Sequence, residues 1–82
     1  MAVYEKKMKK DIEKVLTEAR DFFGPNGAGL EITQDESCCL YFIGSGGHVS
    51  VSVSKGKNEK ETILEIGTRE WDYQVKQFLN KV

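Results

Sequence analysis

Residues 38–66, CCLYFIGSGGHVSVSVSKGKNEKETILEI, decide the fold of this chain. In the middle of this stretch, Val49 to Ser54 alternates apolar and polar side chains at every position. A period of two is typical of a strand with one face on a core, because successive side chains point to opposite faces. The stretch therefore predicts three strands, at Cys38–Ile43, His48–Ser54 and Thr62–Ile66.

The flanking segments predict one more strand and two helices. Apolar side chains recur at three- and four-residue spacing from Tyr4 to Phe23, which is the helical period, and Gly24-Pro25 is expected to end that helix. Leu30–Thr33 is an expected strand. The apolar stripe of Arg69–Lys81 predicts a second helix, with Thr68 as its N-cap.

The lengths of the connections then restrict the topology. The segments between the expected strands are too short for crossover helices, so neighbouring strands should be antiparallel. The sequence therefore predicts an α+β fold with the order α-β-β-β-β-α. In this fold a four-stranded antiparallel meander has both helices packed on one face, where their apolar stripes are buried.

Strand parity separates the two faces of this sheet. If Ile43 lies opposite His48, then Leu40 and Phe42 share the core face with the valines of the alternating strand. The other face combines small serines with aromatic and β-branched side chains, and it fits both a protein-contact surface and a quiet solvent face. The predicted contact surface comprises Cys39, Tyr41, Ile43, His48, Ser50, Ser52 and Ile63, and Ser54 and Glu65 share that face.

Composition excludes several classes of function. The 82 residues are expected to form one domain, residues 1–82, and 12 basic against 13 acidic residues give a net charge of −1. This balance provides no overall attraction to nucleic acid. No apolar run is long enough for a membrane span and no signal peptide is recognisable, so the predictions are no membrane association and a cytoplasmic location.

The two cysteines, Cys38 and Cys39, are adjacent in the sequence. Neighbouring positions on a strand point to opposite faces, so a bond between them would require strong distortion. The sequence therefore predicts two free thiols, with Cys38 protected in the core and Cys39 accessible. Two cysteines without further ligands also make no zinc site, and no metal or cofactor is expected.

A glycine-rich segment and the single histidine are the candidates for chemistry. Consecutive glycines let backbone N–H groups approach an anion, but phosphate loops usually precede a helix, and here strands are expected on both sides. A hairpin turn that requires positive φ accounts for the glycines and is favoured. The possible ligand loop consists of Gly44, Ser45, Gly46, Gly47 and His48.

Catalysis would need His48 beside a nucleophile such as Cys39 or Ser50, with Glu65 as the third group. These groups would lie on an open sheet face, which excludes no water and holds no oxyanion hole. The favoured hypothesis is therefore a non-enzymatic protein-interaction module, an adaptor, inhibitor or immunity-type protein, that uses the helix-free sheet face to bind a partner or a second copy. The alternatives are a small-ligand or anion binder and, with less support, an enzyme.

Overall fold

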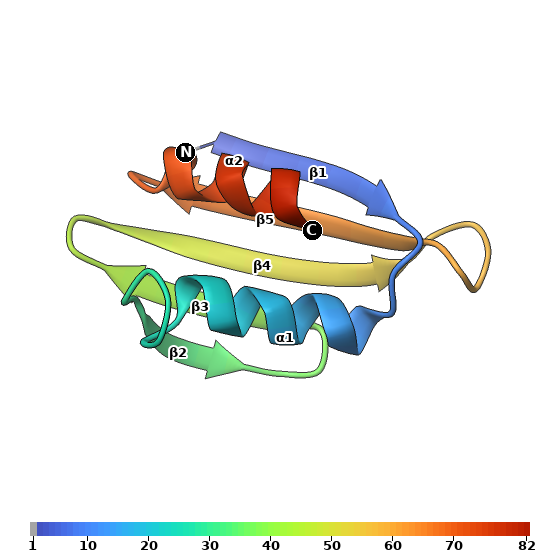
Figure 1. The fold of residues 1–82 in the computed structure, drawn as a ribbon, viewed down its shortest axis with the longest axis horizontal. Helices are drawn as coiled ribbons and strands as arrows, with labels where there is room; N and C mark the ends of the chain where they lie inside the picture. Colours follow the sequence, from blue (N-terminus) through green and yellow to red (C-terminus); the bar gives the residue numbers. More distant parts are fainter. Residues whose placement is uncertain (1) are drawn as a thin grey trace.

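The computed structural model describes residues 2–82, which form a five-stranded antiparallel sheet and two helices (Figure 1). The order of the strands in the sheet is β1-β5-β4-β3-β2. The α+β class is confirmed, but the predicted count of four strands was wrong. The elements are β1 (Ala2–Met8), α1 (Ile12–Phe23), β2 (Glu31–Asp35), β3 (Cys39–Gly44), β4 (Gly47–Lys55), β5 (Thr62–Arg69) and α2 (Asp72–Lys81).

The extra strand is β1, which occupies the first part of the predicted Tyr4–Phe23 helix. It pairs with β5 along its whole length, from Ala2 opposite Thr68 to Met8 opposite Thr62. Its side chains alternate between half-buried and exposed, as a strand with one covered face requires. The helix begins only at Ile12, and its predicted end before Gly24 is confirmed.

The boundary between β5 and α2 also differs from the prediction. Thr68 does not cap a helix: it is buried in β5, and its hydroxyl donates a hydrogen bond of 2.9 Å to the carbonyl of His48. The chain turns at Glu70, which has a φ of 73°, and α2 starts at Asp72. A non-glycine residue in this left-handed region is uncommon, so the reversal concentrates backbone strain at one position.

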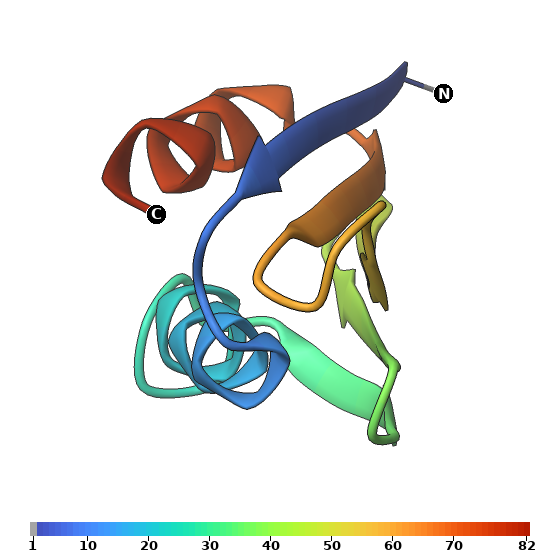
Figure 2. The ribbon, with the colours of Figure 1, turned by 90° about the vertical axis from the view of Figure 1, so that its right-hand side faces the viewer.

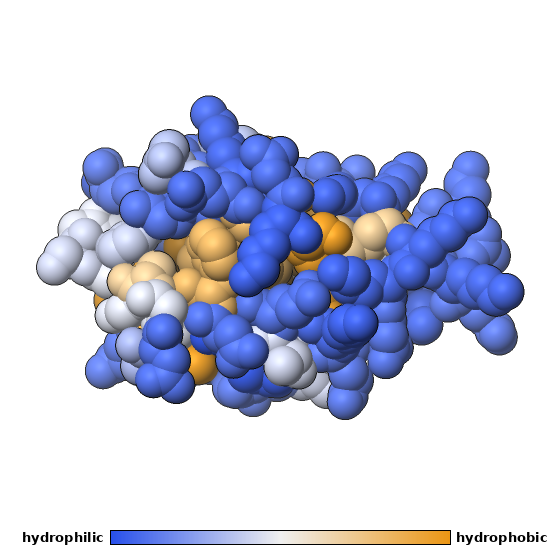
Figure 3. All heavy atoms as spheres, viewed as in Figure 1, coloured by the Kyte–Doolittle hydropathy of each residue, from blue (hydrophilic) through white to orange (hydrophobic). Residues whose placement is uncertain are grey.

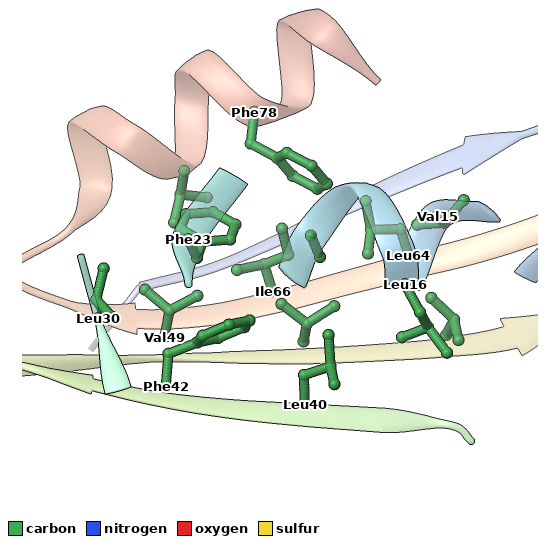
Figure 4. Close-up of a cluster of buried hydrophobic side chains, with 14 residues drawn as sticks. Val15, Leu16, Phe23, Leu30, Leu40, Phe42, Val49, Leu64, Ile66 and Phe78 are labelled. Atoms are coloured by element: carbon green, nitrogen blue, oxygen red, sulfur yellow. The ribbon is translucent and has the colours of Figure 1, made fainter. Parts of the chain in front are cut away.

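Both helices lie on one face of the sheet, and the other face carries no helix (Figure 2). The predicted parity is confirmed, because Ile43 pairs with His48 and Gly44 pairs with Gly47 across the β3–β4 turn. The buried side chains of the sheet all point to the helix side. Together with side chains from outside the sheet, mostly those of the helices, they form the core in Figure 4, which consists of Val15, Leu16, Ala19, Phe23, Leu30, Leu40, Phe42, Val49, Val51, Val53, Leu64, Ile66, Val75 and Phe78.

Phe23 links the sheet and the two helices in this core. Its ring centroid lies 5.5 Å from that of Phe42 on β3 and 5.2 Å from that of Phe78 on α2. Tilted aromatic pairs at this separation add to the stabilisation that burial gives. The last turn of α1 is thereby fixed against both the sheet and the second helix.

Two polar side chains of β1 hold α2 at both of its ends. The Tyr4 hydroxyl donates a 2.7 Å hydrogen bond to Oδ2 of Asp72 in the first turn, and Lys6 Nζ donates one of 2.6 Å to the carbonyl of Leu79 in the last turn. A cation at a helix C-terminus and an acidic residue at the N-terminus both complement the helix dipole. Lys6 is therefore tolerated on the covered side of an edge strand, because its ammonium group satisfies a carbonyl that ends a helix.

The core assignment predicts a large loss of stability in the Leu40→Ala variant. Leu40 is 2% exposed, so the substitution removes buried methyl groups and leaves a cavity, which should cost about 2–5 kcal/mol of unfolding free energy. Ile43→Ala, on the same strand but the opposite face, is the matched control and should cost much less. Chemical denaturation of both variants measures the difference, and equal losses would contradict the assignment of faces.

The Tyr4–Asp72 contact predicts a pH-dependent contribution to stability. The hydrogen bond to Asp72 raises the pKa of Tyr4 above its ordinary value of 10.0, with desolvation and the negative charge of Asp72 acting in the same direction. A group whose pKa is raised in the folded state stabilises it below the unfolded pKa and loses that effect as the pH rises through the folded pKa. Tyr4→Phe should therefore lower the melting temperature near neutral pH.

The difference between wild type and Tyr4→Phe should start to shrink above about pH 10 and disappear as the pH rises through the raised pKa of Tyr4 in the folded state, and thermal melts across this range measure it. Tyr73→Phe is the control, because Tyr73 is exposed and lies next to Asp72 in the sequence without that hydrogen bond. A Tyr4→Phe difference that stays constant through the alkaline range would contradict the role of this contact.

Candidate functional site

The open face of the sheet is the surface opposite the two helices (Figure 2). Its residues are set by strand register, which places Ser50 between Gly67 of β5 and Tyr41 of β3. In the next row, Ser52 lies between Glu65 and Cys39. In these two rows the central strand β4 therefore presents short side chains, and larger side chains, Tyr41 of β3 and Glu65 of β5, stand on the strands beside it.

Tyr41 and His48 form a stacked pair on this face. Their ring centroids are 5.4 Å apart and the ring planes are inclined by 10°. Each ring partly covers the other, so both side chains are half-buried although no helix lies over them. Ile43, which pairs with His48 in the register, is 46% exposed and is the most accessible apolar side chain of the predicted contact surface.

Val3 is a residue of the open face that sequence reasoning missed. It is 62% exposed and lies opposite Gly67, whose lack of a side chain leaves the valine uncovered on that side. The signal in the sequence was a period-two pattern, in which apolar side chains on one face alternate with mostly charged side chains on the other. The first set is Ala2, Tyr4 and Met8, and the second is Val3, Glu5 and Lys7. Lys6 places a charge on the otherwise apolar face, so the strand was not recognised.

Two carboxylates face one another on the same surface. Glu5 of β1 pairs directly with Glu65 of β5, and both side chains are exposed. Like charges placed directly opposite each other destabilise a pair of strands. Within residues 2–82 the ion pairs are Lys10–Glu18 and Arg20–Asp35, so no cation of the described chain forms an ion pair with either carboxylate.

The cysteines depart from the sequence prediction. Cys38 and Cys39 form a disulfide, and Cys38 is exposed instead of core-facing. Strand parity does not apply to Cys38, because it belongs to the turn between β2 and β3. Reciprocal backbone hydrogen bonds between Glu36 and Cys39, of 2.9 and 3.3 Å, leave Ser37 and Cys38 at the tip. The prediction of a protected Cys38 and a free Cys39 thiol was therefore wrong.

The glycine-rich segment forms the predicted hairpin turn. Gly46 has a φ of 75°, a region that glycine adopts readily. A Cβ at Gly44 would lie 2.6 Å from Cζ2 of Trp71. Gly47 is equally restricted, because a Cβ there would overlap the backbone carbonyl of Arg69. The backbone conformation or the close packing of the turn therefore accounts for each of these three glycines without an anion-binding role.

Cys39 and Glu65 are not brought beside His48, and the hydroxyl of Ser50, two residues from His48 on the same strand face, donates a hydrogen bond of 3.3 Å to the carbonyl of Gly67. Cys39 pairs with Ser52 and His48 pairs with Ile43, so they lie four positions apart along β4, or about 13 Å. Glu65 lies opposite Ser52 instead of near His48. Within residues 2–82, no group of three or more His, Cys, Asp or Glu side chains could hold a metal ion.

A basic cluster at one end of the molecule was not foreseen as a unit. The chain after β1 brings Lys9 and Lys10 to Lys55, at the end of β4, and Lys60 of the β4–β5 loop, around an open hollow of about 300 Å³. Asp11 and Glu59 line the same hollow, Lys10 is paired with Glu18 at 3.1 Å, and Lys55 donates to the carbonyl of Glu59. These interactions reduce the net field that the lysines create.

The helix-bearing face also presents apolar surface in the space between α1 and α2 (Figure 3). Phe22 and Trp71 line a hollow of about 350 Å³ there, together with Gln74 and Gln77.

In the described part of the chain, neither helix has the length and apolar character needed to cross a membrane.

Comparisons with known proteins identify the fold and not the function. No protein-family model and no curated protein matches the chain. Among solved structures, the fold is similar to that in the crystal structure of DR_A0006 from Deinococcus radiodurans, with a TM-score of 0.59 and 14% sequence identity. The match covers 96% of this chain and 91% of the other. At this identity the similarity supports the arrangement of helices and strands alone.

The contact between Gly44 and Trp71 gives a prediction for the β3–β4 hairpin. Gly44→Ala places a methyl group against a rigid ring, and overpacking of this kind costs about 1–3 kcal/mol. Ser45→Ala, one residue later at the exposed turn, is the control and should leave stability nearly unchanged. Denaturation followed by the fluorescence of Trp71, the single tryptophan, measures both effects. Wild-type stability and emission in Gly44→Ala would contradict the contact.

Proposed function

We propose that this protein is a non-enzymatic interaction module that binds a protein partner through the open face of its sheet. The contact surface is centred on Tyr41 and Ile43, and Val3 extends it across the strands to the β1 edge. Cys39, His48, Ser50, Ser52 and Ile63 complete it. A cytoplasmic location and the absence of enzymatic activity stay predictions that accompany this proposal.

The exposure of apolar side chains on this face carries the proposal. Three large apolar or aromatic side chains of the described chain are prominently exposed, and two of them, Val3 and Ile43, are on the open face. The third, Tyr73, is 69% exposed on α2. Exposed apolar groups gathered on one surface often mark protein interfaces, and the small side chains of Ser50 and Ser52 leave room for a partner's side chains.

Charge supports a particular chemistry for the partner. Glu5 and Glu65 repel each other across β1 and β5, and they lack an ion-pair partner within residues 2–82. A lysine or arginine of a bound protein would relieve this repulsion and fix the orientation of the complex. We therefore propose a partner surface that combines a basic side chain with apolar groups that contact Ile43 and Tyr41.

The test uses two substitutions of the same kind on opposite faces. Ile43→Glu introduces charge into the proposed contact surface, and Tyr73→Glu introduces it at an exposed position of α2. We expect a partner captured by the wild type to bind Ile43→Glu at least about tenfold more weakly, a loss of about 1.4 kcal/mol, and to bind Tyr73→Glu normally. Circular dichroism verifies that both variants fold.

A third variant tests the charge argument. Glu65→Gln removes one member of the acidic pair, so binding of a basic partner should weaken and depend less on salt. Sedimentation at several concentrations separates a second copy of this chain from a different protein. The proposal fails if the wild type neither associates with a second copy nor binds another protein. It also fails if Ile43→Glu and Tyr73→Glu bind the partner equally well.

A further inference from the structure

We propose that the Cys38–Cys39 pair is a reversible thiol–disulfide site, which a small dithiol or a protein dithiol opens in the folded protein. This inference does not rest on the proposed function, although Cys39 also belongs to the proposed contact surface, and it assigns a chemical reaction to the β2–β3 turn. It is based on the position of the disulfide, its separation from the contacts that stabilise the fold, and the chemistry of adjacent thiols.

The site is accessible to a reductant. Thiol–disulfide exchange requires an attacking thiolate to reach one of the two sulfur atoms. Cys38 lies at the tip of the turn and is exposed, as are Glu36 and Ser37 before it, whereas Cys39 is half-buried. Both helices lie against the other face of the sheet, so neither of them covers the open-face side of β3 (Figure 2).

The disulfide does not act as a structural cross-link. A disulfide stabilises a fold chiefly by closing a loop in the unfolded chain, and the effect grows with the length of that loop. Cys38 and Cys39 are one residue apart, so their bond closes no loop of other residues. Opening it should therefore leave the stability of the domain almost unchanged.

Other interactions hold the turn in place without the sulfur atoms. The backbone groups of Glu36 and Cys39 bond to each other in both directions, and Cys39 pairs with Ser52 of β4. Arg20 of α1 makes a two-pronged ion pair with Asp35, with Nη2 2.8 Å from Oδ1 and Nε 3.0 Å from Oδ2. The hairpin can therefore keep its register in both oxidation states.

The reaction proceeds in two exchange steps. One thiolate of the reductant attacks Sγ of Cys38, a new S–S bond forms, and the bond to Cys39 breaks to release its thiolate. The second thiol of the reductant, after losing its proton, attacks its own sulfur in the mixed disulfide and releases the thiolate of Cys38. Two electrons and two protons pass to the cysteines, and the reductant becomes a disulfide.

The adjacency of the cysteines favours a dithiol over a monothiol as the reductant. After the first step the Cys39 thiolate stays beside the mixed disulfide, and it can attack Cys38 again and expel a monothiol. A dithiol completes the second exchange intramolecularly and therefore competes with this reversal. The exposed carboxylate of Glu36, two residues before Cys38, also disfavours the approach of a reductant with a net negative charge.

The experiment counts free thiols on the native protein by alkylation and intact-mass spectrometry. Protein purified without reductant should take no label, and protein treated with dithiothreitol under native conditions should take two, one on each cysteine. After the dithiothreitol is removed, an excess of oxidised glutathione should return the count to none, because the Cys39 thiolate expels glutathione from the mixed disulfide on Cys38. Far-ultraviolet circular dichroism and the melting temperature should stay nearly constant throughout.

A probe for adjacent thiols and two variants complete the test. Phenylarsine oxide, which bridges neighbouring thiols, should add one arsenic to the reduced wild type and none to the oxidised form. Cys38→Ser and Cys39→Ser should each take one label with or without reductant and should not retain the arsenical. The proposal would be overturned if the protein took two labels before reduction. It would also be overturned if the reduced cysteines took label only in denaturant, or if reduction unfolded the protein.

Discussion

Phe23 packs against Phe42 of β3 and Phe78 of α2, and this contact holds the two helices on the same face of the sheet (Figure 4). The consequences extend through the whole structure. All the buried apolar side chains of the sheet must point toward the helices, which fixes the parity of every strand. With both helices committed to one face, the described chain contains no further element that covers the other. The open face is therefore the direct result of one-sided burial.

The edge strand β1, which lies beside β5, contributes to both faces of the sheet. Its covered side holds α2 through Tyr4 and Lys6, and its uncovered side adds Val3 and Glu5 to the open face. One strand thus contributes both to the attachment of the second helix and to the surface proposed to bind a partner. Lys6 performs the attachment without an apolar side chain, by donating to a terminal carbonyl of the helix.

The sequence predicted the fold correctly where the spacing of apolar residues fits one kind of secondary structure, and it failed where the spacing fits two. The alternation from Val49 to Val53 is compatible with a strand alone, and it correctly assigned Leu40 and Phe42 to the core face. Tyr4 and Met8 are four residues apart, a spacing that fits both a helical stripe and one face of a strand. Their alignment with the helix that begins at Ile12 led to the wrong assignment of β1.

The candidate site was predictable to the extent that it depends on parity. Tyr41, Ile43 and His48 lie on the open face as their positions in the strands predict. Val3 was missed because its strand was missed. The cysteine pair was misjudged because parity was applied to Cys38, which lies in a turn where side-chain directions follow the backbone reversal instead of the pleat.

The two proposed activities meet at one corner of the open face. Cys39 is on the same side of β3 as Tyr41, two residues away, and it lies in a row with Ser52 and Glu65. Opening the disulfide would replace a compact sulfur bridge by two separate thiols beside the proposed contact surface. The backbone bonds of the turn do not involve the sulfurs, so this change would be confined to the surface. Partner binding would then respond to the oxidation state through local shape, with the sheet and its core unchanged.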